Sequence, residues 1–400
     1  MSTIRANKYE NTSTSDGGIS IDNSGHVTID GQQLPTAGAL SHRNLVANGA
    51  MTVAQRGTSK TGLTDGNTGY YTVDRFQWLE QGSPTYVQTM SQSTDSPVGF
   101  SNSLKLETTT ADTASTGLKA NAITYIFEGQ DLQSLAYGTT SAKSFTLSFW
   151  VKSSVTGTYV VWLYNADQTR SCTQSYTIDT ANTWEYKTIT VAGDTSSGFD
   201  NDNGGSLYVR WVLGAGSDFT SGTASTTWIS GNVNADKYVG QTANIFGAVG
   251  NTWQITGVQL EVGEKATPFE HRNFGDELAR CQRYFVKSGN IGTAAEWFPG
   301  VATHAEHGRV TALALDGQND RAVIIDRFPT TMRAAGSATF YPGRDQVTNT
   351  AGNITVYNGN TSVTTTGKPI PSTRGFEAYF TGTSTDARAY TLQYTVDSEL

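Results

Sequence analysis

The sequence predicts an all-β protein, and three features of its composition and patterning carry that prediction. Aromatic residues make up 10% of the 400 residues, whereas charged residues make up only 16%, against roughly 25% in ordinary globular proteins. Ser, Thr, Asn and 42 glycines take the place of the missing charges, which is typical of pleated sheets joined by many tight turns. Several segments also alternate apolar and polar residues with a period of two, the period of a strand.

Residues 42–270 carry the strongest strand patterns. Segment 145–152 places apolar side chains at alternate positions, namely Phe145, Leu147, Phe149 and Val151. Residues 159–164 are apolar on both faces, which predicts a central strand. The pattern continues in three further segments: 184–191, 207–213 and 253–262. Since loops rich in Gly, Asn and Asp separate these segments, the region is predicted to form a jelly-roll β-sandwich.

Residues 1–41 are too short and too polar for a core of their own, but they contain a predicted β-hairpin. Its apolar residues alternate around a turn at 23–25, namely Ile19, Ile21, Val27 and Ile29. A lone hairpin is marginal in water, so these four residues are predicted to lie at an oligomer interface or against another protein. A frayed chain end is the alternative.

One helix is predicted, over 274–285, inside a linker that we place at 271–286. Apolar or semi-apolar side chains follow a helical spacing at Leu278, Cys281, Gln282 and Phe285. Leu278, Cys281 and Phe285 either pack around a three-fold axis, as an oligomer interface, or pack on their own sandwich. Residues 287–400 are predicted to form a second, smaller β-domain, with strands at 310–315, 321–325, 338–341, 354–357, 376–380 and 390–396.

Charge and cysteine usage exclude several classes of protein. The net charge is −8 and the pI about 5.2, and the chain has no long Lys/Arg run, which argues against nucleic-acid binding. No apolar run approaches the about 18 residues of a membrane span, and residues 1–10 do not resemble a signal peptide. Cys172 and Cys281 do not make a disulfide scaffold. We therefore expect a protein that is made in a cytoplasm, is not exported by the usual route and is released by lysis.

No motif in the chain predicts catalysis, a metal or a cofactor. The acidic residues are scattered, and no 20–30-residue repeat of the kind that builds a glycan-cleaving β-helix is present. His304 and His307, with His271 upstream, are a poor zinc set. Asp200 and Asp202 are a weak calcium candidate, for which a solvated turn with Asx hydrogen bonds is the plainer explanation.

Sugar binding is the chemistry that the residue types favour, because exposed Trp and Tyr rings stack on the apolar faces of sugars. If Phe149 and Val161 face inward, then Trp150, Trp162 and Tyr164 share the opposite face, which is either an outer platform or a subunit interface. In the C-terminal domain the candidate ligand-binding residues near predicted turns are Tyr341, Arg344, Tyr357, Arg374 and Tyr379.

Two blocks of sequence resemble a domain of tailed-bacteriophage tail-fibre and minor virion proteins. The opening block is Asn44-Leu-Val-Ala-Asn-Gly-Ala-Met51 with Gln55-Arg-Gly57 and Val73-Asp-Arg-Phe76. The closing block runs from Ile255 to Gly263, then through Ala266-Thr-Pro-Phe-Glu-His-Arg272 and Glu277-Leu-Ala-Arg-Cys-Gln-Arg-Tyr284. The similarity covers about residues 44–286. It implies a jelly roll akin to carbohydrate-binding modules, placed in a virion fibre, and supplies no set of ligand residues.

These observations predict a virion protein that attaches a phage to host surface glycans by non-catalytic binding. Its expected partners are two further copies of itself, phage tail or capsid proteins held through residues 1–41, and host polysaccharide or lipopolysaccharide. It is expected to need no cofactor, nucleic acid or membrane. A purely structural virion component, such as a head fibre, decoration protein or tail adaptor, and a polysaccharide depolymerase are the alternatives.

Overall fold

The computed structural model describes residues 8–10, 18–21, 27–29, 32–33, 41–113, 117–287, 310–313, 321–342, 353–358, 361–381 and 389–400. In several strands of the C-terminal part the description covers the backbone alone. The chain divides into two compact units, Met1–Phe274 and Gly275–Leu400. The predicted helix begins at this boundary, so most of it lies in the second unit.

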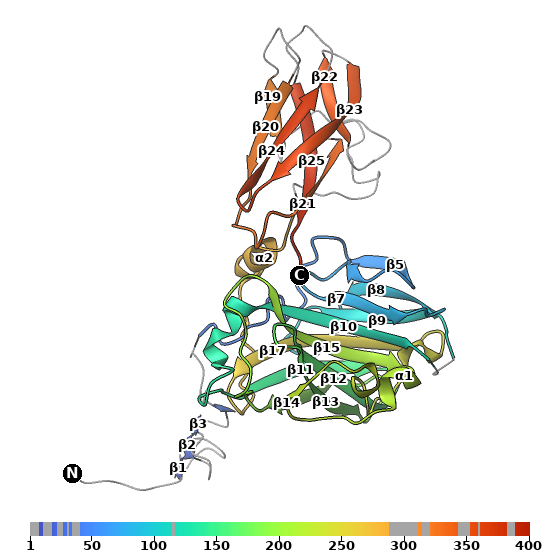
Figure 1. Ribbon diagram of the computed structural model, residues 1–400, viewed down its shortest axis with the longest axis vertical. Coiled ribbons are helices and arrows are strands. Elements are labelled where there is room, and N and C mark those ends of the chain that lie inside the picture. The colour runs from blue at the N-terminus through green and yellow to red at the C-terminus, as the bar shows by residue number, and fades with distance from the viewer. Residues whose placement is uncertain are drawn as a thin grey trace, which may run out of the picture. The chain divides into compact units, whose positions relative to one another are not determined.

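Unit 1 is an antiparallel β-sandwich, as the sequence predicts (Figure 1). The strand order of its seven-stranded sheet is β16 (Ile229–Ser230), β13 (Arg170–Ile178), β12 (Gly157–Asn165), β15 (Gly205–Ala215), β10 (Lys119–Glu128), β7 (Gln77–Gly82) and β6 (Gly69–Tyr70). The order of its six-stranded sheet is β14 (Glu185–Val191), β11 (Phe145–Ser153), β17 (Thr252–Val262), β9 (Ser103–Thr110), β8 (Val87–Ser93) and β5 (Ser59–Leu63). Successive strands cross between the sheets, as β10, β11 and β12 do, which is the connectivity of a jelly roll.

The main core fills the space between the two sheets and follows the predicted alternation. Phe145 and Phe149 of β11 are fully buried, and Phe149 meets Trp211 of β15 edge to face with ring centroids 5.9 Å apart. The segment predicted to be central, 159–164, lies in β12 between β13 and β15. Burial of such large rings is the dominant stabilising contribution to a sandwich of this size.

Part of the connection between β15 and β17 packs on the outer face of the seven-stranded sheet. The connection contains the short helix α1 (Ser217–Thr220) and two 3-10 turns, Asn234–Asp236 and Ile245–Gly247, and the second turn packs in the main core through Ile245 and Phe246. Phe219 and Tyr238 of this connection form a second small core with Trp162, Val160 and Val212. This covering layer decides which side chains of that face reach solvent.

The N-terminal region forms a small sheet of its own, with the order β1 (Lys8–Glu10), β2 (Gly18–Ile21), β3 (Val27–Ile29) and β4 (Gln32–Gln33). The predicted hairpin is confirmed, since Ile19 pairs with Ile29 and Ile21 with Val27. Ile19, Ile21 and Ile29 are each about 40% exposed. Their role at an oligomer interface stays a prediction.

The helix of unit 2 is shorter than predicted. Helix α2 spans Phe274–Gln282 and is followed at once by strand β18, Phe285–Lys287. Phe285 therefore lies on a strand paired with Asp397, and its assignment to a helical stripe was wrong. Cys281 and Phe285 are 0% and 6% exposed within the single chain, so neither is available to an oligomer interface, and Leu278 is half-buried.

Unit 2 is a β-domain with a strand over each range that the sequence predicts. One sheet has the order β18, β25 (Ala389–Asp397), β22 (Asn353–Asn358), β23 (Thr361–Pro371), β24 (Gly375–Thr381) and β20 (Arg321–Arg327), with β19 (Val310–Leu313) and β21 (Ser337–Pro342) also paired to β25. Strand β23 was not predicted, because its Thr, Gly, Lys and Pro residues show no apolar alternation. In the described part of unit 2, Phe328, Phe376 and Tyr394 form an aromatic core.

Two expectations about the whole chain can be compared with the described residues. Cys172 and Cys281 are both buried, and within the described part of the chain neither forms a disulfide. Among the same residues no helix has both the length and the apolar character to span a bilayer.

Candidate functional site: an aromatic groove on the six-stranded sheet

The floor of the candidate site is the outer face of the six-stranded sheet. Trp150 alternates with the buried Phe149 on β11 and so points outward. In the sheet register Trp150 lies between Tyr186 of β14 and Thr256 of β17. The Trp150 and Tyr186 ring centroids are 5.3 Å apart, and Tyr186 is 44% exposed. Together the two rings make a partly open aromatic surface.

A bulge at Gly257 shapes this floor. Two residues of β17, Gly257 and Val258, face the single residue Phe149 of β11, and Gly257 has φ +63°, the geometry of a glycine bulge. A Cβ atom at Gly257 would lie 2.7 Å from the ring of Phe100 and 3.1 Å from the ring of Trp150. Glycine is required here because the backbone is left-handed and both rings pass over it.

Two loops form the walls of the groove. One is 97–100, which carries Phe100 and the fully exposed Val98. The other is the strap, our name for residues 264–272, whose Phe269 ring lies 5.0 Å from the Phe100 ring. The groove that they enclose with the sheet has a volume of about 500 Å³ and is lined by Val98, Gly99, Phe100, Ser148, Trp150, Tyr186, Gly257, Ala266, Thr267, Pro268, Phe269 and His271. We call it the aromatic groove.

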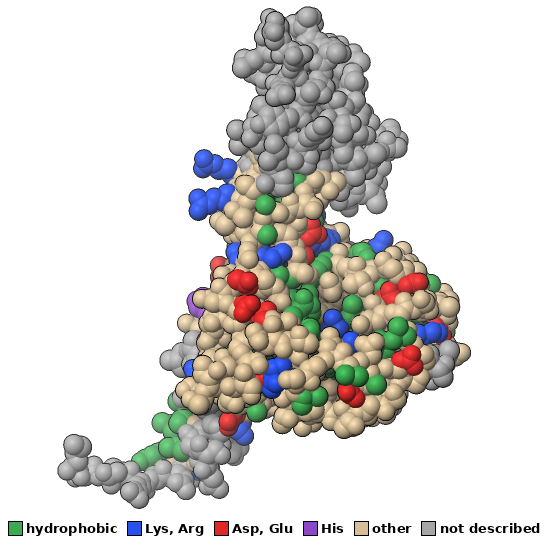
Figure 2. Space-filling model, in the orientation of Figure 1, with side chains coloured by type: hydrophobic (Ala, Val, Ile, Leu, Met, Phe, Trp, Pro, Cys, Tyr) green, Lys and Arg blue, Asp and Glu red, His purple; other side chains and the backbone are tan. Residues whose placement is uncertain are grey.

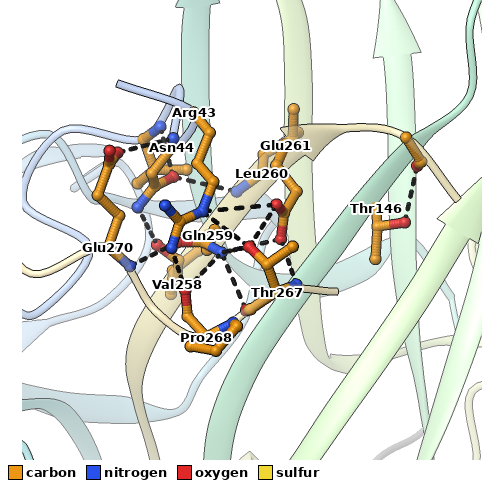
Figure 3. A network of polar contacts seen from close by, with 12 residues as sticks. Arg43, Asn44, Thr146, Val258, Gln259, Leu260, Glu261, Thr267, Pro268 and Glu270 are labelled. Carbon is orange, nitrogen blue, oxygen red and sulfur yellow. Dashed lines mark hydrogen bonds and ion pairs between the residues drawn. The ribbon is translucent and has the colours of Figure 1, made fainter. Parts of the chain in front are cut away.

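A buried carboxylate fixes the strap to the sheet (Figure 3). Glu261 of β17 is 2% exposed and accepts hydrogen bonds from the Thr267 backbone N–H at 2.8 Å and from the Thr267 hydroxyl at 2.7 Å. The amide of Gln259 donates to the same carboxylate at 2.8 Å. A buried charge is tolerated when its lone pairs are satisfied in this way.

The opening block of the sequence holds the other end of the strap (Figure 3). The Asn44 side chain donates to the Val258 carbonyl at 3.1 Å and accepts from the Leu260 N–H at 3.1 Å, so it binds β17 at the bulge. Its backbone N–H donates to the Glu270 carboxylate at 3.0 Å. Gly49 allows this close approach, since a Cβ there would lie 2.1 Å from the Val258 carbonyl oxygen.

The surroundings of Glu270 lower the pKa of its carboxyl group and so favour its ionised form. Burial raises the pKa of its carboxyl group, but the hydrogen bond from the Asn44 N–H and the positive charges of Arg272 and Arg43 outweigh burial and lower the pKa below its usual value. Arg272 lies 3.1 Å from the Glu270 carboxylate. The strap is therefore held partly by charge.

A polar cluster borders the groove on the next row of the same sheet face. Lys152 forms an ion pair with Asp95, to which the Trp184 indole and the Gln254 amide also donate at 3.2 Å. The Lys152 ammonium lies 5.3 Å from the centre of the Trp184 ring. Burial raises the Asp95 pKa, but the three donors together lower it below its usual value, so this carboxyl is anionic and is unsuited to donate a proton.

The described residues that line the groove include neither Asp nor Glu. The groove thus presents aromatic faces, the hydroxyl of the exposed Tyr186 and the imidazole of His271, and its composition suits stacking and hydrogen bonding. On the face of unit 1 in Figure 2, acidic and basic side chains are dispersed among uncharged ones rather than gathered into one block.

The predicted aromatic residues do not lie together. Trp150 lines the groove, but Trp162 and Tyr164 belong to β12 of the other sheet, so the prediction that all three share one face was wrong. The chain crosses between the sheets after β11, and equal alternation then points the side chains of β12 the opposite way. Trp162 is 1% exposed and offers no open ring to a ligand, whereas Tyr164 is half-buried.

The C-terminal candidates are placed less completely. Tyr341, Tyr357 and Tyr379 lie on β21, β22 and β24, and their side chains lie outside the described residues. Arg344 also lies outside them. Arg374 is exposed in the turn before β24, where its carbonyl accepts from the Phe328 N–H at 3.0 Å.

The metal candidates have ordinary structural roles where the structure describes them. Asp202 accepts from the Gly204 N–H at 2.8 Å, which is the Asx hydrogen bond of the plainer explanation. His271 lines the groove, and His304 and His307 lie outside the described residues. Among the described residues no group of three His, Cys, Asp or Glu side chains could hold a metal ion.

Of the residues that line the groove, sequence reasoning identified Trp150 alone as a ligand candidate. Phe100, Phe269 and His271 come from loops, and no periodicity marks a loop residue as part of a site. Gly257 did carry a signal, because an isolated glycine inside a strand pattern indicates a bulge or a close approach.

No protein-family model matches this chain, and no curated protein matches it. Solved structures with a similar fold include the enzymatically active domain of tailspike protein 4 of bacteriophage CBA120, at 13% identity and a TM-score of 0.31 over 55% of this chain and 21% of that one. This chain therefore spans about a fifth of the tailspike chain.

Two further similar structures are sugar-binding proteins by name. A putative sugar-binding protein from Bacteroides thetaiotaomicron is 12% identical, with a TM-score of 0.30 over 56% of this chain and 100% of that one. A xylan-binding domain from Paenibacillus barcinonensis is 10% identical, with a TM-score of 0.26 over 58% and 99%. At such identities and scores none of these proteins assigns a role to a residue of this chain. Membership of a tail-fibre family stays a prediction.

Proposed function

We propose that this chain is a non-catalytic glycan-binding virion protein, and that the aromatic groove receives the sugar. The observation that carries the proposal is the groove itself. It has a volume of about 500 Å³, and its lining contains aromatic rings and no described carboxylate. Sugars present apolar C–H faces that stack on such rings and hydroxyl groups that bond to polar edges. Trp150 and Tyr186 would supply the stacking surface, with the Tyr186 hydroxyl and the His271 imidazole as polar partners.

The same lining supports binding without cleavage. Glycoside hydrolysis generally requires two carboxyl groups across the scissile bond, one of them protonated. Asp95, which borders the groove, is held as an anion by Lys152, Trp184 and Gln254. It would therefore be a poor general acid.

The virion role rests on the sequence blocks that resemble tailed-phage fibre proteins. In the structure the closing block includes the strap, which is one wall of the groove, and the opening block includes Asn44, which holds the strap and β17 together. A fibre that displays several copies needs weak sites only, since multivalency raises the overall affinity. The proposed receptors are host surface polysaccharides or lipopolysaccharides.

The experiment is a glycan array with the full chain, followed by calorimetry on the best ligand with Trp150→Ala and Tyr186→Ala. We expect each substitution to weaken binding by about tenfold, from the loss of one stacked ring. Phe274→Ala is the matched control, since Phe274 is 58% exposed and lies outside the groove.

Three results would contradict the proposal. Unchanged affinity in both groove variants would remove the groove as the site. New reducing or unsaturated ends on incubation with host polysaccharide would show cleavage. Failure of an antibody against the chain to label virions would remove the virion role while leaving the glycan site intact.

A further inference from the structure

The outer face of the seven-stranded sheet carries a second cluster of aromatic and charged side chains, which we call the cation surface. In the sheet register Trp162 of β12 lies beside Arg210 of β15, and Tyr164 beside Tyr208. The Trp162 and Tyr164 rings are stacked with centroids 5.0 Å apart. Tyr164, Tyr208 and Arg210 are half-buried, so the surface is partly open to solvent. Lys237, from the connection between β15 and β17, completes it.

Two cations share the Trp162 ring. The Arg210 guanidinium lies 4.9 Å from the ring centre and 5.8 Å from the centre of Tyr208. The Lys237 ammonium lies 5.6 Å from the same Trp162 ring, although Lys237 is only 8% exposed. Both positive charges are thus held over one apolar surface.

Neither cation forms an ion pair within the part of the chain that the structure describes, although the Asp167 carboxylate is near enough to act on Tyr208, whose pKa is raised by burial and also by that carboxylate. The Lys237 ammonium donates to the Asn234 amide oxygen at 2.7 Å, and Arg210 reaches the Tyr238 hydroxyl at 3.5 Å. Other partly buried cations of unit 1 are paired: Lys119 with Asp112 at 2.7 Å, and Arg170 with Asp194. Arg210 and Lys237 therefore differ from the structural cations of the same sandwich.

Unpaired polar atoms lie beside these charges. Thr124 of β10 is directly opposite Arg210 in the register and is fully buried. Within the described residues its hydroxyl and the Arg210 Nε group have no hydrogen-bond partner. Buried polar atoms without partners cost about 1–3 kcal/mol each, and each such exception calls for an explanation, of which a bound ion nearby is one.

These charges are unfavourable without an anion. Burial and the neighbouring Arg210 charge lower the Lys237 pKa to about 8, which is the response of a cation that lacks a counter-ion. An anionic ligand would neutralise both charges and accept hydrogen bonds from their remaining N–H groups. The half-exposed Tyr164 and Tyr208 rings would at the same time offer an apolar face for a sugar ring.

We propose that the cation surface is a second saccharide site, selective for an acidic sugar. Arg210 and Lys237 receive its carboxylate, and Tyr164 and Tyr208 contact the face of its ring. The site is separate from the aromatic groove, because the two lie on the outer faces of different sheets. A free inorganic anion is the other source of the same negative charge, but it would make no use of the two tyrosine rings.

The test is calorimetry on the full chain with three acidic trisaccharides, of galacturonate, glucuronate and mannuronate, each paired with its carboxyl-reduced neutral counterpart. We expect at least one acid to bind about tenfold or more tightly than its counterpart, the usual strength of a charge-assisted hydrogen bond. Arg210→Met and Lys237→Met should each abolish that preference. Sodium phosphate and sodium acetate test the free-anion source.

Lys60→Met is the matched control. Lys60 is also a cation beside an aromatic ring, 5.7 Å from the centre of Tyr71, but it belongs to β5 of the six-stranded sheet. Its substitution should leave the preference for acids intact. Thermal melting checks that each variant folds. If Arg210→Met does not fold, the binding preference of Lys237→Met alone tests the proposal. Equal binding of all acids and their counterparts, or a preference that survives Lys237→Met, would overturn the proposal. Phosphate or acetate binding as tightly as the best acid would replace it with a simple anion site. Failure of the groove variants above would not affect this result.

Discussion

The two outer faces of the sandwich begin from the same pattern and end differently. Trp150 and Trp162 both alternate with buried core residues on successive strands, β11 and β12. Around Trp150 the strap and the 97–100 loop stand to the sides and leave an open groove. Over Trp162 the connection between β15 and β17 places Tyr238, whose ring meets Trp162 edge to face with centroids 6.1 Å apart, and Phe219 packs in the same small core. Alternation thus decides which face a side chain takes, whereas distant segments decide whether that face is open.

The largest effect should come from removing the two rings in turn. Trp162→Ala should lower the free energy of unfolding by about 3–5 kcal/mol, because it leaves a cavity between the sheet and its cover. Trp150→Ala should cost about 1 kcal/mol or less, since that ring is half-open. Urea unfolding of both variants measures the difference. Similar losses in the two would mean that the faces are equally packed.

A smaller effect is expected when the strap loses its anchor. Glu261→Ala leaves the donors of Thr267 and Gln259 without an acceptor in a buried position, which should cost about 2–4 kcal/mol. Glycan affinity at the groove should fall as well, because the strap is its wall. Glu264→Ala, an exposed carboxylate of the same strap, is the control and should change stability by less than about 0.5 kcal/mol. Equal effects in the two variants would show that the buried network does not hold the strap.

The strands of the sandwich were predictable because their signal is local. Phe145–Val151 alternate within a single segment, and so do the two halves of the N-terminal hairpin. Strand β23 lacks that alternation and was missed. The predicted helix was too long because Phe285 also fits a helical spacing. Its strand partner, Asp397, is distant in the sequence, so no local pattern shows that pairing.

The candidate site was predictable in residue type but not in position. Trp150 was identified as a candidate ring, yet its neighbours Phe100 and Phe269 are brought to it by loops that begin tens of residues away. The burial of Trp162 depends on Phe219 and Tyr238, and no local pattern around β12 shows that this cover exists. No local pattern in the closing block indicates that Glu261 is buried, as the structure shows it to be beneath the strap.

The Gly257 bulge of β17 lies on the face that carries the aromatic groove. Gly257→Ala should lower stability by about 1–3 kcal/mol, because the new Cβ meets the rings of Phe100 and Trp150. Gly250→Ala is a matched control, since Gly250 is also left-handed at φ +83° but has nothing within 4 Å of an added Cβ. The difference between the two variants isolates the clash from the backbone strain. If they cost the same, the rings do not depend on the bulge, and groove affinity should then be unchanged in Gly257→Ala.

The smallest expected effect is a difference between the two faces in how the free energy of unfolding depends on pH. The Glu270 pKa is lowered in the folded protein, so its stabilising contribution is complete above the ordinary value of 4.5 and is lost as the pH falls through the lower folded value. Glu270→Gln should therefore be less stable than the parent protein by a constant amount between pH 7 and pH 5. The gap should narrow below pH 4.5. Lys237→Met, on the face whose cations have no described carboxylate partner, should leave the acid limb of the stability curve unchanged. Unfolding by urea at each pH measures both, and an acid limb that survives Glu270→Gln intact would show that the strap is held without that charge.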